Sequence, residues 1–152
     1  MKSNRVIIGL FLGIFLGTIT HAEAHEKRFV QSRYHFVVGF LKEPAFSGEM
    51  NGIDLRVSDA DSGAPVKGLE SALTADVWTP EQTKALKLPL RGRYGQEGAY
   101  GAYFLPARPG KYHFRIHGVI DGVAIDEAFV SGKETFADVE DSNTLVFPPL
   151  AE

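Results

Sequence analysis

The chain contains no cysteine, and it has only two methionines and one tryptophan. The absence of cysteine excludes disulfides, thiolate metal sites, a cysteine nucleophile and lipid attachment through a cysteine. Only Met50 follows the first 24 residues, so a methionine-rich Cu(I) site is excluded as well.

Catalytic signatures are also missing. The sequence has no G-x-S-x-G motif, no phosphate-binding loop and no dinucleotide fingerprint, and its glycines at 92, 95 and 98 open no helix. No nucleophile lies at a recognisable spacing from a base. The sequence therefore predicts a protein that is not an enzyme.

One long apolar run is present, and it lies at the N-terminus. Lys2 and Arg5 precede an uncharged stretch over residues 6–19, which is short for a membrane span but typical of a secretory signal. Ala22-Glu23-Ala24 has small residues where signal peptidase cuts, and cleavage after Ala22 is the alternative. The remaining alternative is an uncleaved anchor.

The chain from His25 on has 128 residues, which suits a single domain. Without Lys2, Arg5 and Glu23 it has 14 basic and 18 acidic residues, a net charge of about −4. Such a charge argues against nucleic acid or an anionic membrane as a partner. We expect a periplasmic or secreted protein that keeps no stable membrane anchor after processing.

Short runs rich in Val, Ile, Phe and Tyr alternate with Gly, Pro and Asp-Gly turn signals, a spacing typical of an all-β sandwich. Asp121-Gly122 predicts a two-residue hairpin turn. The pattern predicts seven to eight strands, at 33–41, 51–58, 73–79, 85–90, 99–105, 111–120, 123–129 and 145–147. The predicted divisions are a signal peptide (1–24), an N-terminal extension (25–32), the domain (33–148) and a tail (149–152).

Two segments carry a family resemblance. Residues 98–106, followed by Pro109-Gly110 and a strand beginning near Tyr112, resemble exported bacterial immunoglobulin-like domains, with Tyr112 as a tyrosine-corner residue. Glu43-Pro44, the glycines at 48 and 52, and the turn from Asp59 to Val66 resemble the YtkA-like group of periplasmic domains. These resemblances imply an immunoglobulin-like β-sandwich.

His25 carries a more distant resemblance, to the CopC-type copper-binding sandwiches, whose processed chain begins with a copper-binding histidine. Cleavage after Ala24 would place an α-amine, with an ordinary pKa of about 7.7–8.0, beside the His25 imidazole. Two such nitrogens suit Cu(II). Cleavage after Ala22 would put His25 third from the amine, which is also a chelating arrangement. A solvated terminus without a ligand is the alternative.

His113 and His117 are the other candidate metal ligands. They lie on the outer face of one predicted strand, roughly 13 Å apart at about 3.3 Å per residue, so they cannot both bind one ion. One of them could join His25 or His35 from across the sheet, and a polar sheet face without a ligand is the alternative.

The predicted function is that of an exported binding domain that handles copper or another divalent metal. The alternative is a protein-interaction module of an envelope or secreted complex without a metal. Its contact with an envelope protein partner would involve the edge strands and the loop Arg91-Gly92-Arg93-Tyr94.

Overall fold

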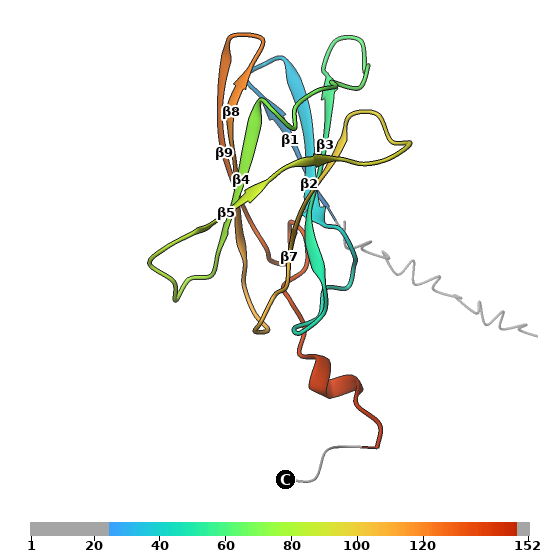
Figure 1. Cartoon of the computed structure of the whole chain (residues 1–152), viewed down its shortest axis with the longest axis vertical. Coiled ribbons are helices and arrows are strands. Elements are labelled where there is room, and N and C mark those ends of the chain that lie inside the picture. The colour runs from blue at the N-terminus through green and yellow to red at the C-terminus, as the bar shows by residue number, and fades with distance from the viewer. Residues whose placement is uncertain (1–24, 149–152) are drawn as a thin grey trace, which may run out of the picture.

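The structure is a computed structural model that describes residues 25–148. The predicted signal at 1–24 and the tail at 149–152 lie outside the described residues. Two antiparallel sheets pack face to face (Figure 1). One sheet has the strand order β1 (His25–Val30), β2 (Tyr34–Phe40), β3 (Asn51–Asp59), β7 (Ala99–Phe104) and β6 (Arg91–Gly92). The other has the order β5 (Leu86–Pro89), β4 (Leu73–Trp78), β8 (His113–Ile120) and β9 (Val123–Val130).

The predicted all-β, immunoglobulin-like sandwich is confirmed, with nine strands rather than seven to eight. The core lies between the sheets and is lined by alternate residues of each strand. Phe40 is central to it: its ring lies 5.1 Å from the ring of Phe114 and 5.6 Å from that of Phe136, centroid to centroid. All three side chains are fully buried.

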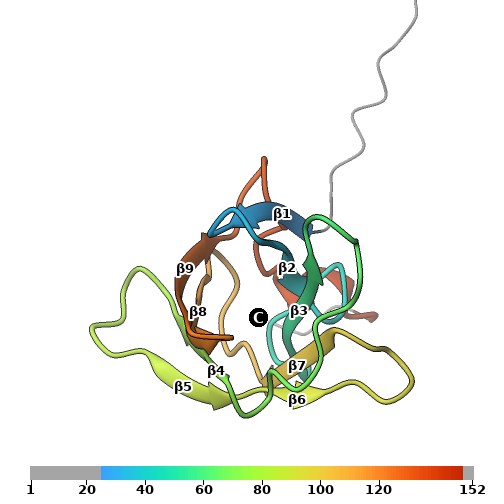
Figure 2. The same ribbon diagram turned by 90° about the horizontal axis from the view of Figure 1, so that it is seen from above.

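The segment predicted as an N-terminal extension begins instead with strand β1, which pairs antiparallel with β2. The polar sequence of β1 gave no alternating apolar pattern, because the charged Arg28 occupies an inward position. The Arg28 guanidinium lies 4.2 Å from the centre of the Phe129 ring and donates at 2.9 Å to Glu127 of β9. Seen from above, β1 lies beside β9, so this charged contact closes one seam between the sheets (Figure 2).

The strand predicted over 145–147 is absent from the described structure. A single 3₁₀ turn, η1 (Ser142–Leu145), lies there instead, and the side chain of Asp141 caps its start by accepting a hydrogen bond from the backbone N–H of Asn143 at 3.0 Å. Phe147 is apolar, but it is 93% exposed and is not part of the core of the sandwich.

The Asp121-Gly122 hairpin is confirmed. Both residues have positive φ, 49° and 80°, and they join Ile120 to its cross-strand partner Val123. The strand before this turn runs from His113 to Ile120 without a break. Within residues 25–148, no helix is long and apolar enough to cross a lipid bilayer.

Candidate functional site

Asp54 lies on the outer face of the five-stranded sheet, yet its side chain is only 2% exposed. Its neighbours across the strands explain this burial: Gly39 of β2 on one side and Gly101 of β7 on the other, neither of which has a side chain. The ring of Tyr103 lies over Gly101, where an added Cβ would come within 3.3 Å of it. The carboxylate therefore lies in a notch in the sheet surface.

Three side chains close this notch. His25 Nε2 lies 3.2 Å from Asp54 Oδ2. Arg93 Nη1 donates to Oδ1 at 2.9 Å, and Arg56 Nε and Nη2 donate to Oδ2 at 3.2 Å each. His25 reaches the carboxylate because it pairs with Gly39, which leaves the path between them open. We call His25, Asp54, Arg56 and Arg93 the Asp54 notch.

The charges around Asp54 keep it ionised. Burial alone would raise its pKa, but the hydrogen bond from His25 and the positive charges of Arg56 and Arg93 outweigh burial and hold the pKa below its ordinary value. At neutral pH the carboxylate is therefore an acceptor of hydrogen bonds only. Glu43 behaves differently: burial raises its pKa, against the hydrogen bond from the backbone N–H of Phe40 and the electrostatic influence of His25.

The ionised carboxylate determines which nitrogen of His25 carries the proton. Because Asp54 cannot donate, Nε2 is the protonated nitrogen of a neutral His25 ring, and Nδ1 keeps its lone pair. A carboxylate that holds one ring N–H in this way is the common outer support of a metal-binding histidine. The ring is 23% exposed, so ligands from solvent can reach it.

The structure does not bring His113 and His117 to this site. Both lie on β8, on the outer face of the other sheet, as their alternation predicted. His117 Nε2 lies 3.0 Å from Asp76 Oδ2, and the His113 ring stacks on Trp78 at 5.1 Å between centroids. The outer faces of a sandwich point in opposite directions, so one ion cannot contact His25 and either of these residues.

Among residues 25–148, no group of three or more His, Cys, Asp or Glu side chains is placed to hold a metal ion. The remaining donors that suit a metal at this site are therefore two nitrogens of a single residue, the imidazole Nδ1 and, in a processed chain, the α-amine of His25.

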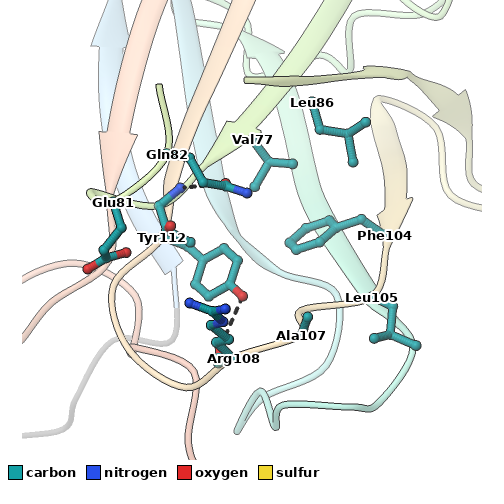
Figure 3. A pocket seen from close by; sticks show the side chains of 10 residues that line it. Val77, Glu81, Gln82, Leu86, Phe104, Leu105, Ala107, Arg108 and Tyr112 are labelled. Carbon is teal, nitrogen blue, oxygen red and sulfur yellow. Dashed lines mark hydrogen bonds between the residues drawn. The ribbon is translucent and has the colours of Figure 1, made fainter. Parts of the chain in front are cut away.

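A separate cavity of about 460 Å³ opens between the two sheets, near the loop before β8 (Figure 3). At its wall the Tyr112 hydroxyl donates to the Arg108 carbonyl oxygen at 3.0 Å, which confirms the predicted tyrosine corner. The lining combines apolar side chains with the polar or charged ones of Thr79, Glu81, Gln82 and Arg108. It is formed by Val77, Thr79, Glu81, Gln82, Leu86, Phe104, Leu105, Ala107, Arg108 and Tyr112.

Alternation within the strand at 51–58 puts Asp54 on its outward face, and nothing in that local pattern marks it as buried. The signal that marks it is the pair of outward glycines at 39 and 101, and these become its neighbours only through the register of three strands. Arg93 was predicted to lie in a contact loop, and its side chain instead bonds to Asp54.

Comparison with known proteins adds little to this description. No protein-family model matches the chain, and no curated protein matches it. Among solved structures, the crystal structure of the Lin-41 filamin domain is similar, with a TM-score of 0.43 and 20% sequence identity over 68% of this chain and 91% of that chain.

Proposed function

We propose that the protein is an exported, non-enzymatic binding domain that captures Cu(II) at the processed N-terminus, through the α-amine and Nδ1 of His25. The observation that carries the proposal is the contact between His25 Nε2 and the buried, ionised Asp54. This contact fixes the ring tautomer and turns Nδ1 into the available nitrogen.

The donor set fits this ion. The α-amine and Nδ1 of one histidine close a six-membered chelate ring, and amine and imidazole nitrogens suit Cu(II), which binds most tightly among the common divalent ions. Arg56 and Arg93 would repel a bare cation, but both guanidinium groups point to Asp54, whose negative charge offsets one of them.

Each residue of the notch has a role in this proposal. His25 binds the ion, Asp54 holds its ring, and Arg56 and Arg93 hold Asp54. β1 supports the terminus, because its pairing with β2 begins at His25 itself. Since no acid, base or nucleophile is required, the proposed activity is capture and release of the ion.

The test is a Cu(II) titration of the protein purified after export, with its first residue established by N-terminal sequencing. We expect one tight equivalent, with two nitrogens in the electron paramagnetic resonance spectrum. His25→Ala should abolish tight binding, and Asp54→Asn should weaken it by about 10- to 100-fold.

His35→Ala is the matched control, because His35 lies on the same face and its ring packs at a tilt against Phe29, 5.2 Å away between centroids and away from Asp54. This variant should bind as the unchanged protein does. A chain that begins at Ala24 keeps the ring but moves the amine, and it should also bind less tightly. Equal affinity for the unchanged protein and His25→Ala would refute the proposal.

A further inference from the structure

The outer face of the five-stranded sheet carries a surplus of positive charge. Its outward positions hold four basic side chains and one acidic side chain, Asp54. The rest of the domain must therefore be strongly acidic, because the chain from His25 on has a net charge of about −4. The basic side chains are those of Lys27, Arg56, Arg91 and Arg93.

The strand register arranges these charges around His25. One row across the sheet runs His25, Gly39, Asp54, Gly101 and Arg91. Arg91 thus lies at the far end of the row that begins with His25, four strands and roughly 19 Å away at about 4.8 Å per strand. The next row carries Lys27, Arg56 and Arg93. We call this surface the basic face.

Pairing within the protein leaves part of this charge uncompensated. Asp54 balances one of the two guanidinium groups that bind it. At the rim, Lys67 and Glu97 neutralise each other at 2.6 Å. Arg91 is exposed. An acidic partner would meet a complementary potential at Arg91 and at the guanidinium charge beside Asp54 that stays unbalanced.

The basic face also has the shape and composition of a docking surface. A hollow of about 320 Å³ lies beside the notch, and the exposed side chains of Met50 and Tyr103 form part of its wall together with Arg93. Tyr, Met and Arg are the residue types enriched in protein–protein interfaces. Arg93 belongs to both the hollow and the Asp54 notch, and Asp54 in turn contacts His25, from which an ion would leave.

We propose that the basic face docks an acidic protein that accepts Cu(II) from His25. The inference rests on the proposed function. Transfer is an exchange of ligands: nitrogen or oxygen donors of the acceptor lose their protons as they replace the amine and Nδ1, the freed amine takes up one of these protons, the rest pass to the solvent, and no electron moves. The basic face raises the rate of encounter and orients the acceptor over the hollow.

The experiment uses the copper-loaded, processed protein and two synthetic acceptor peptides. Both begin Gly-Gly-His, which chelates Cu(II), and they continue with four glutamates or with four lysines. Stopped-flow absorbance follows copper transfer at low and high salt. We expect the acidic peptide to accept copper at least about 10-fold faster at low ionic strength, and the advantage to vanish near 0.5 M salt.

Two variants with equal changes of net charge locate the effect. Arg91→Glu should slow transfer to the acidic peptide several-fold and hasten transfer to the basic one. Lys84→Glu is the matched control, because this exposed residue lies in the β4–β5 loop, which projects away from β1, β2 and β3 (Figure 1). Its rates should stay close to those of the unchanged protein.

The outcomes separate the two proposals. If the protein binds Cu(II) but both peptides accept it at equal rates, docking is overturned and the proposed function stands. If the two variants change the rates equally, net charge alone explains the bias and docking is again overturned. If the unchanged protein binds no Cu(II) in the initial titration, the proposed function fails and the transfer proposal fails with it.

Discussion

Asp54 is a carboxylate buried on the outer face of a sheet, and the free-energy cost of burying its charge explains the residues around it. An ionised group that loses its water must recover hydrogen bonds from the protein. Asp54 recovers them from β1, from its own strand and from the segment after β6, through His25, Arg56 and Arg93. Each partner is thereby held in place, which is a useful property for a ligand at a chain terminus.

Tyr112 shows the same principle in the core. Its hydroxyl donates to the Arg108 carbonyl oxygen at the cavity wall. Burial raises its pKa above the ordinary value of 10.0, and burial does the same for Tyr100, whose hydroxyl donates to the Val66 carbonyl oxygen. Both phenols therefore favour the neutral form in the folded state.

Tyr112→Phe should lower the free energy of unfolding by about 1 kcal/mol at pH 7, because one hydrogen bond is lost. A pKa raised by folding contributes stability that is complete below the unfolded pKa and is lost as pH rises through the folded value. The difference between the two proteins should therefore shrink above pH 10. Urea unfolding from pH 7 to pH 11 measures it.

The control for this prediction is Tyr94→Phe, since Tyr94 is fully exposed. It should leave the urea midpoint unchanged across the same pH range. A difference between Tyr112→Phe and the unchanged protein that stays constant up to pH 11 would contradict the argument.

At the scale of elements, Gly118 lets β8 run unbroken past β4. It pairs with Leu73 at a φ of 149°, a conformation that residues with a Cβ rarely adopt. A Cβ there would lie 2.1 Å from the Ala72 carbonyl oxygen, and backbone cannot move aside as a flexible side chain can. The close approach of the two strands depends on this glycine.

Gly118→Ala should therefore destabilise the protein severely, by about 3 kcal/mol or more, through strain and separation of β4 from β8. Gly92→Ala is the matched control, because Gly92 lies in β6 with open space where its Cβ would be. Thermal unfolding should show a large fall in Tm for the first variant and little change for the second. Equal Tm values would exclude the proposed clash.

Most strands were predictable because one alternating face of each is apolar, as in Tyr34, Phe36, Val38 and Phe40. β1 was not, because its inward Arg28 takes its partners, Glu127 and Phe129, from a strand about a hundred residues later. The segment at 145–147 was the opposite case: its residues are apolar but pack in no sheet. Local pattern indicates which residues prefer burial, whereas the edges of the sandwich depend on distant contacts.

At the scale of the whole molecule, the candidate site was predicted only in part. His25 followed from the predicted cleavage site, but its supposed helpers, His113 and His117, lie on the opposite sheet. Alternation along a strand assigns residues to an inner or an outer face, yet it cannot say which of two sheets that outer face belongs to. The same limit hid Asp54, whose burial depends on glycines contributed by two other strands.

The whole fold should also respond to copper in a way that isolates the contribution of Asp54. An unfolded chain with the same terminus still has the amine and the ring of His25, so binding stabilises the folded state only by the ratio of the two affinities. If Asp54 improves affinity about 10- to 100-fold, saturating Cu(II) should raise the free energy of unfolding by about 1.4–2.7 kcal/mol.

Asp54→Asn should still bind Cu(II), more weakly, while losing most of this stabilisation. Its amide holds the His25 ring without a negative charge and without fixing which ring nitrogen carries the proton. Urea unfolding with and without saturating Cu(II) measures the effect for both proteins. An equal increase in the free energy of unfolding for both proteins would contradict this prediction. It would mean that the Asp54 carboxylate does not raise the affinity of the folded terminus for Cu(II) above that of the unfolded chain.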